Sequence, residues 1–155
     1  MEHKIKDNAL KVTSSHHPFE DTTKRLLQLA HKWRPGDEYK FVDSIPCSIV
    51  DAKHSRKVSA RVGWHNYPDG SENWRSAGGD VRVLTSRFAT FYRLPCKVPG
   101  SHKMQEKYVY LRLRIDDLNI PDFADLRGKL AAHFAHRMRS ELNCSNAPHI
   151  PGKLT

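Results

Sequence analysis

The chain has 155 residues, 38% of them hydrophobic and 28% charged, a balance typical of one globular domain large enough to bury a core. Lys and Arg number 26 against 17 Asp and Glu, and the net charge of +9 indicates a polyanionic partner, either a nucleic acid or an anionic membrane. No apolar run approaches the roughly 20 residues that cross a bilayer, and the polar start has no signal-peptide core, so we expect an intracellular protein that does not span a membrane.

The amino-terminal third is expected to contain an arm and one helix. Residues 1–18 are polar and without periodicity, which predicts a flexible arm. The following DTTKRLLQLAHKW predicts a short helix, because apolar residues from Leu26 to Trp33 recur at helical spacing. The Pro-Gly pair at 35–36 would end it.

Two stretches alternate polar and apolar side chains and therefore predict strands. The first is RKVSARVGWH at 56–65, and the second is YVYLRLRIDD at 108–117. Their apolar positions would face a core. Their opposite positions would share one basic and aromatic face, which carries Lys57, Ser59, Arg61, Tyr108, Tyr110, Arg112 and Arg114.

Between these strands we expect helices. Ser71 would cap a brief helix through Trp74, and Asp80 would begin another that stops at Pro95. The apolar stripe of the second helix would consist of Val81, Leu84, Phe88 and Phe91.

The carboxyl-terminal part is expected to hold a short strand and a long helix. Leu-Asn-Ile at 118–120 predicts a returning strand, and Asp122 would cap a strongly amphipathic helix after it. The stripe of that helix is Phe123, Leu126, Leu130, Phe134, Met138 and Leu142. Residues 144–155 contain two prolines and a glycine and predict a frayed tail.

The three cysteines, Cys47, Cys96 and Cys144, are far apart in the sequence. Neither C-x-x-C nor a Cys/His ligand spacing occurs, so we expect no zinc site, and the odd, scattered count favours thiols over a disulfide framework. His16 and His17 have no third ligand near them in sequence. We therefore expect neither a metal nor another cofactor.

Together these elements predict an α+β fold, with one domain over residues 19–143. A small antiparallel or mixed sheet would have helices on one face and leave the basic face open. One interpretation of that face is that it is simply the solvent-exposed side of a basic protein. Two observations favour a binding function instead. Neither strand has an acidic residue on that face before Asp116, and Arg, Ser and Tyr are the side chains that bind phosphates and 2′-hydroxyls. Such a face suits the shallow minor groove of A-form RNA.

Several segments resemble the small RNA-silencing suppressors of tombusviruses and aureusviruses, in the same order over roughly residues 56–143. In YVYLRLRIDDLNIPDFADLRGKL the matching residues are Arg112, Arg114, Asn119 and Ile120. In GGDVRVLTSRF they are Gly79, Asp80, Ser86, Arg87 and Phe88, and in KVSARVGWHNYPD they are Tyr67 and Asp69. The opening MEHKIKDNA is also similar.

The resemblance implies a non-enzymatic viral suppressor of RNA silencing. It would bind and sequester double-stranded small interfering RNA in the host cytoplasm, and also in the nucleus. The sheet would extend across a homodimer through the last strand and helix, at Leu118, Asn119, Ile120, Phe134 and Met138. An edge strand at 118–120 would satisfy its backbone groups by pairing with its symmetry mate.

The family carries two tryptophans three residues apart on an N-terminal helix, and they stack on the ends of the duplex. Trp33 occupies the second place, with Arg34 beside it for a terminal phosphate, but Ala30 stands in the first. Loss of one ring implies relaxed length selection. The alternative for Trp33 is a place in the core.

The other tryptophans are less informative. Gly63-Trp64 is similar to the Gly-Trp hooks that bind Argonaute, which would give a weak contact, although the strand alternation favours a core position for Trp64. Trp74 could be core or exposed.

Other functions remain open. Glu38-Tyr39-Lys40, with Asp21 upstream, resembles the E-x-K strand of metal-dependent nucleases, which need converging carboxylates around a divalent ion. A nucleocapsid-type coat protein would be equally basic, but it would accept single strands. A membrane-surface binder would need an exposed apolar helix face, which we do not expect here.

Overall fold

The computed structural model describes residues 10–13, 18–39, 44–51, 53–67, 73–86, 89–118 and 120–155. In these ranges the elements are β1 (Leu10–Thr13), α1 (Pro18–Lys32), β2 (Ser44–Asp51), β3 (Arg56–Asn66), β4 (Arg75–Gly78), β5 (Val81–Thr85), β6 (Thr90–Leu94), α2 (Gln105–Tyr108), β7 (Val109–Leu118) and α3 (Ala124–Glu141).

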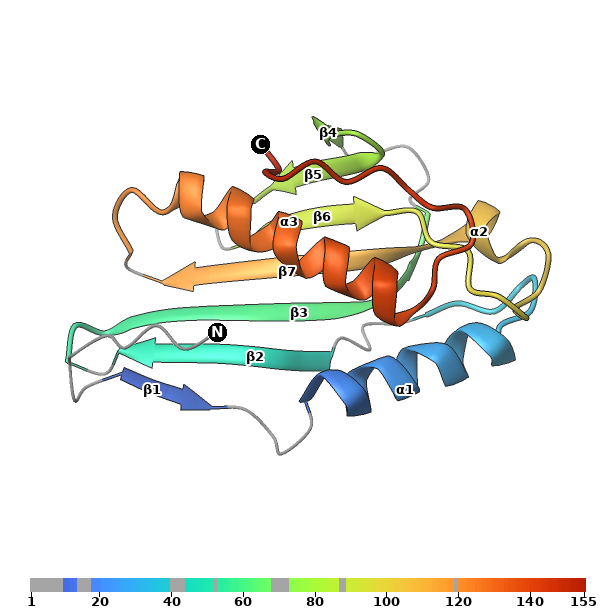
Figure 1. The fold of residues 1–155 in the computed structure, drawn as a ribbon, viewed down its shortest axis with the longest axis horizontal. Coiled ribbons are helices and arrows are strands. Elements are labelled where there is room, and N and C mark those ends of the chain that lie inside the picture. Colours follow the sequence, from blue (N-terminus) through green and yellow to red (C-terminus); the bar gives the residue numbers. More distant parts are fainter. Residues whose placement is uncertain are drawn as a thin grey trace.

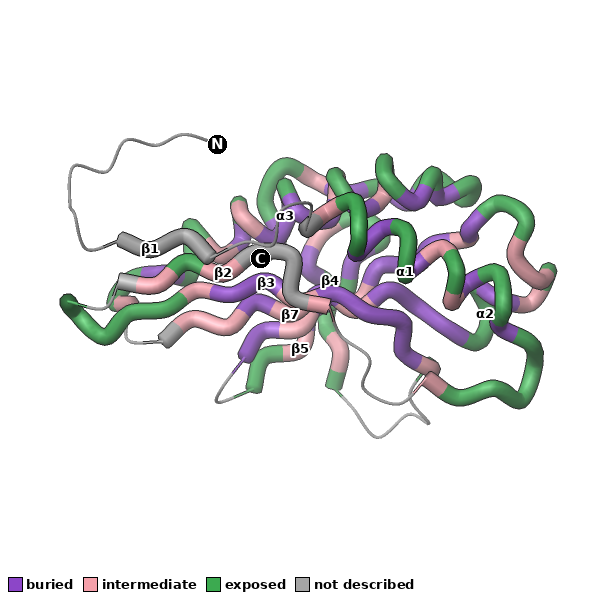
Figure 2. The backbone as a smooth tube through the Cα atoms, turned by 90° about the horizontal axis from the view of Figure 1, so that it is seen from below, coloured by how far each residue is buried: buried purple, intermediate pink, exposed green. Residues whose placement is uncertain are grey.

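The strands form one seven-stranded sheet in the order β1-β2-β3-β7-β6-β5-β4 (Figure 1). Every neighbouring pair is antiparallel. Helices α1 and α3 lie on the same side of the sheet, as the edge-on view in Figure 2 shows. The expected α+β fold with helices on one face is therefore confirmed, whereas extension of the sheet across a homodimer stays a prediction.

The core lies between the sheet and the two long helices. Alternation along β3 turns Val62 and Trp64 into it, where both are buried. The indole Nε1 of Trp64 donates a hydrogen bond to the carbonyl oxygen of Leu26, 2.9 Å away, which joins β3 to α1. Small residues of α3 such as Ala131 and Ala135 are fully buried, so this helix can approach the sheet closely.

Residues 75–78, 81–85 and 90–94 form strands, so the prediction of helices there was wrong. Val81 and Val83 are buried while Arg82 between them is exposed, which is the alternation of a strand with one face on a core. β6 then pairs with both β5 and β7, so its backbone groups are satisfied across the sheet. Ser71 and Phe88 lie outside the described residues.

The segment after β7 also differs from its prediction. Leu118 still belongs to β7, opposite Lys57 on β3, and Ile120 lies in a loop, so no separate edge strand forms from these described residues. Asn119 lies outside them. The helix α3 is confirmed, but its N-cap is Phe123, and Asp122 has a left-handed backbone with φ of 53° in place of a capping role.

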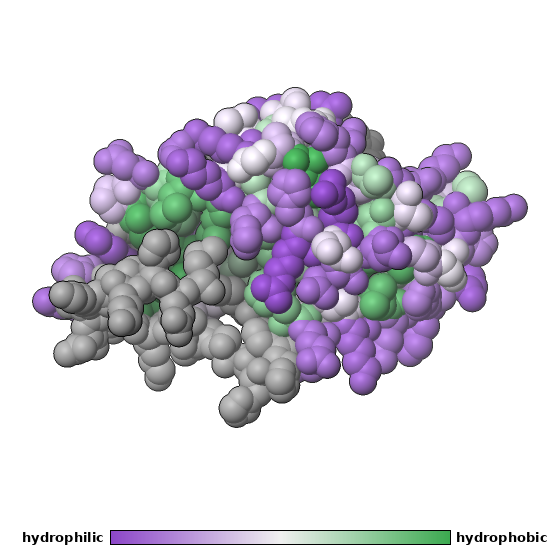
Figure 3. Space-filling model, viewed as in Figure 1, coloured by the Kyte–Doolittle hydropathy of each residue, from purple (hydrophilic) through white to green (hydrophobic). Residues whose placement is uncertain are grey.

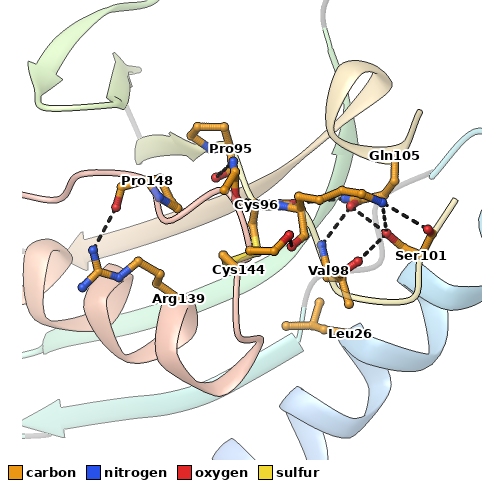
Figure 4. Close-up of a disulfide and its surroundings, with 12 residues drawn as sticks. Leu26, Pro95, Cys96, Val98, Ser101, Gln105, Arg139, Cys144 and Pro148 are labelled. Atoms are coloured by element: carbon orange, nitrogen blue, oxygen red, sulfur yellow. Dashed lines mark hydrogen bonds between the residues drawn. A yellow bond between two sulfur atoms is a disulfide. The ribbon is translucent and has the colours of Figure 1, made fainter. Parts of the chain in front are cut away.

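The carboxyl-terminal segment packs against the domain, so the prediction of a frayed tail was wrong. A disulfide joins Cys96, just after β6, to Cys144, just after α3 (Figure 4). Further along, the Leu154 N–H donates to the Gly128 carbonyl of α3 at 3.0 Å. The expectation of unpaired thiols was wrong for these two cysteines, because a separation of 48 residues in sequence conceals their closeness in space.

Part of the segment predicted to be a flexible arm forms a strand. Leu10–Thr13 form β1 and pair with β2 at one edge of the sheet.

Figure 3 views the helix side, where hydrophilic surface predominates and apolar surface occurs in separate patches. Among the helices of the described ranges, none combines the length and hydropathy required to cross a membrane.

Candidate nucleic-acid interface

The side of the sheet turned away from α1 and α3 is called the open face below. Strand alternation fixes which residues share it. Arg61 on β3 is directly opposite Arg114 on β7, and Gly63 is opposite Arg112. The same register places Arg93 of β6 opposite Arg112.

One row of arginines crosses three strands of this face. Arg82 of β5 is opposite Arg93 of β6, which is opposite Arg112 of β7. We call these three residues the arginine row. Neighbouring strands are about 4.8 Å apart, so the row concentrates three positive charges within a short span.

Like charges in directly opposite positions destabilise a sheet, and the pair Arg61–Arg114 repeats that arrangement beside the row. Asp116 offsets part of this repulsion. One of its carboxylate oxygens lies 2.7 Å from Nε of Arg114, and the other lies 3.3 Å from Nε of Arg61. The Ser59 hydroxyl donates a hydrogen bond of 3.2 Å to the same carboxylate.

Aromatic rings support the arginines from below and beside. The Phe91 ring lies under the guanidinium groups of Arg112 and Arg114, at 4.9 and 5.4 Å from the ring centroid. Arg93 lies over the rings of Tyr67, Trp74 and Tyr110 at 5.3, 5.0 and 5.6 Å. Such contacts hold guanidinium groups without neutralising their charge.

The described open face of β3, β5, β6 and β7 carries six basic side chains and one carboxylate, and therefore a net charge of +5. The basic residues are Lys57, Arg61, Arg82, Arg93, Arg112 and Arg114. Within the described ranges there is no cluster of three His, Cys, Asp or Glu residues able to hold a metal ion. Fixed guanidinium and ammonium groups arranged in this way can bind anionic oxygens.

The residues predicted for this face are mostly brought together by the fold. Lys57 is exposed, and Arg61, Arg112 and Arg114 are half-buried on the same surface. Ser59 is 3% exposed, so its hydroxyl supports Asp116 and is not available to a ligand.

The two tyrosines depart from the prediction. Tyr110 is on the open face but is 4% exposed beneath its aromatic neighbours. Tyr108 belongs to α2 and stacks on Trp33 with ring centroids 6.0 Å apart, so it leaves the open face. The strand begins at Val109, one residue later than expected.

Trp33 is a core residue, which corrects its assignment to duplex-end stacking. Its side chain is 2% exposed, its Nε1 donates to the Asp37 carbonyl at 3.2 Å, and both ring neighbours are protein side chains. Arg34 turns back to donate to the Trp33 carbonyl at 2.7 Å. Trp64 is 1% exposed, so the Argonaute hook at Gly63-Trp64 is wrong as well.

The helix residues assigned to a dimer interface are buried within one chain. Met138 is inaccessible, and Phe134 packs edge-to-face against Phe19 of α1 at 6.0 Å. Both fill the space between α3 and the rest of the domain, so they offer no surface to a second copy.

Sequence reasoning missed Arg82, Phe91 and Arg93, because residues 80–94 were interpreted as a helix. The alternation in VRVLT and TFYRL was the available signal. Tyr67 and Trp74 lie on either side of residues 68–72, which are outside the described ranges, and no pattern in the sequence assigned either of them to this face. Burial raises the pKa of Tyr67 while Arg93 lowers it, and the phenol stays neutral at neutral pH.

The nuclease motif does not assemble a site in the described residues. Tyr39 donates a 2.5 Å hydrogen bond to the Leu29 carbonyl, and burial raises its pKa, so this side chain anchors the loop to α1. Glu38 is exposed beside it, Asp21 lies in the first turn of α1, and Lys40 falls outside the described residues.

Comparison with known proteins gave no match: no family model and no curated protein matches the sequence, and no solved structure matches the chain.

Proposed function

We propose that this chain binds double-stranded RNA independently of sequence, with the open face as its interface. The observation that carries the proposal is the in-register placement of arginines across adjacent strands. Repulsion among them lowers stability, and a polyanion laid across the face would relieve it.

The residue types favour contact with the nucleic-acid backbone over reading of bases. Guanidinium groups bind phosphate oxygens in fixed geometry, and phosphate contacts carry no sequence information. A broad sheet face cannot enter the deep major groove of A-form RNA, but it can lie across the wide minor groove. Duplex RNA is therefore the preferred ligand.

The biological role that we propose follows from the resemblance described above. A duplex-RNA binder of this kind would sequester small interfering RNA in the host cytoplasm and suppress silencing. Relaxed length selection fits the burial of Trp33, since a side chain that is 2% exposed offers no ring face to a duplex end. A homodimer remains part of the proposal on the resemblance alone.

The test is a binding panel measured by fluorescence anisotropy, with duplex RNA of several lengths, duplex DNA and single-stranded RNA. Replacing Arg112 and Arg114 with Ala should weaken binding to all duplex RNA sequences equally and reduce the salt slope by about one per lost contact. The matched control is Lys24→Ala with Arg25→Ala, which removes the same charge from exposed positions of α1. Equal effects of the two double variants would mean that the open face is not the interface.

A single-stranded RNA coat protein is the second candidate. Tyr67, which is exposed, and Trp74, which is half-buried, favour it, because accessible rings beside cations also bind unpaired bases. Preference for single strands in the same panel would select this function over duplex binding.

A further inference from the structure

A group of aromatic side chains lies at one end of the open face, where β3 ends and β7 begins. Tyr67 follows β3, Trp74 precedes β4, and Tyr110 is the second residue of β7. With Arg93 of β6 they form what we call the aromatic cluster. Arg93 also belongs to the arginine row, so the cluster continues directly from the phosphate-binding surface.

The cluster has a buried floor and an accessible rim. Tyr110 is the floor, and its centroid is 5.2 Å from that of Tyr67 and 5.9 Å from that of Trp74. Tyr67 is 36% exposed and Trp74 is half-buried. Tyr110 is covered by these aromatic neighbours, whereas the two rim rings and the guanidinium group of Arg93 remain at the surface.

This combination suits a nucleobase. Bases stack on aromatic rings and on guanidinium planes, and each stacked base adds substantially to affinity. A base inside a duplex is already stacked on both sides and does not reach a side chain. A base without a pairing partner is free to turn out of the helix and onto such a surface.

We propose that the aromatic cluster binds an unpaired nucleobase at the end of a duplex whose phosphates lie on the arginine row. This inference rests on the proposed function and names a preference within it: duplexes with overhanging nucleotides over blunt ones. In this proposal the rim ring of Tyr67 stacks on the base, and Arg93, whose guanidinium group lies 5.3 Å from the centroid of that ring, binds the neighbouring phosphate.

The experiment compares three RNA duplexes with identical paired segments: one blunt, one with unpaired nucleotides at its 3′ ends, and one with the same extension made abasic. The abasic extension keeps the added phosphates and removes the bases. Wild-type protein should bind the overhanging duplex about tenfold more tightly than the other two. A 2-aminopurine base in the overhang should lose fluorescence on binding.

Tyr67→Ala should abolish this preference, measured as the ratio of the affinities for the overhanging and the blunt duplex, whereas Tyr67→Phe should retain the ratio because the ring remains. Tyr108→Ala is the matched control, since Tyr108 is an exposed tyrosine, 45% accessible, that stacks on Trp33 away from the open face. Thermal unfolding of each variant verifies its fold.

Three results would overturn the inference. Equal wild-type affinity for the three duplexes excludes base stacking, while duplex binding itself, and with it the proposed function, still stands. Equal weakening of blunt and overhanging duplexes by Tyr67→Ala would reduce the cluster to a structural role. Failure to bind any duplex would remove the proposed function as well.

Discussion

Asp116 is an acid on a surface that otherwise gathers cations, and its contacts explain its presence. It lies within 3.3 Å of Nε of both Arg61 and Arg114, which are themselves directly opposite each other. The carboxylate therefore reduces the repulsion between two guanidinium groups and fixes their direction. At the same time it repels any phosphate that approaches the pair.

Replacing Asp116 with Asn should separate these effects. The open face gains one unit of net charge, so affinity for duplex RNA should rise a few-fold at low salt, and the unfolding free energy should fall by about 1 kcal/mol. Anisotropy over a salt series and urea denaturation measure the two. A fall in RNA affinity would show instead that the carboxylate mainly orients the arginines for the ligand.

Gln105 shows what a single buried amide does for the loop between β6 and β7. It is fully buried, and its Nε2 donates to the Cys96 carbonyl at 3.0 Å while its Oε1 accepts from the Val98 N–H at 3.1 Å (Figure 4). Replacing Gln105 with Leu removes the hydrogen-bond partner of the buried Cys96 carbonyl and of the buried Val98 N–H. The unfolding free energy should fall by about 3 kcal/mol in urea denaturation. Gln28→Leu, at an exposed position of α1, should cost little.

At the scale of elements, alternation predicted β3 and β7 because each strand has one face on the core and one on the surface. The same alternation is present in β5 and β6. Their residues Val81, Leu84 and Phe91 also fit helical spacing, and local pattern could not decide between the two. The decision comes from pairing with β7, which is distant in sequence.

The packing of the carboxyl-terminal segment against the domain requires glycine at two positions, and this requirement is visible only in the three-dimensional structure. A Cβ at Gly128 would meet the Leu154 carbonyl oxygen, and one at Gly78 would meet Pro151 at 2.8 Å. These contacts join α3 and β4 to the end of the chain. The hydrophobic periodicity of a single element therefore cannot predict them. The prediction of a frayed tail failed for this reason.

Gly128→Ala should therefore destabilise the protein by about 2 kcal/mol, even though alanine favours a helix, because the tail must shift to admit the methyl group. Gly152→Ala is the control, since nothing lies within 4 Å of a Cβ built there. Chemical denaturation of both variants measures the difference. Equal stability of the two would mean that the tail adapts without loss of contacts.

At the scale of the whole molecule, the Cys96–Cys144 disulfide closes a long loop that contains β7 and α3. Its 48-residue separation corresponds to about 4 kcal/mol of restricted unfolded-chain entropy. Replacing both cysteines with Ser should lower the unfolding free energy by that order. Denaturation with and without a reductant checks the value, because wild-type protein should approach the variant only when reduced.

The insertion of β7 between β3 and β6 has a consequence for how the protein is made. Synthesis runs from the amino end, so β1 to β6 leave the ribosome before Val109–Leu118 does. Until that strand arrives, Arg61 and Arg93 belong to two halves that share no edge. The complete arginine row therefore forms only after β7 has been synthesised, so under the proposed function a nascent chain has no complete surface to bind the RNA of its own ribosome.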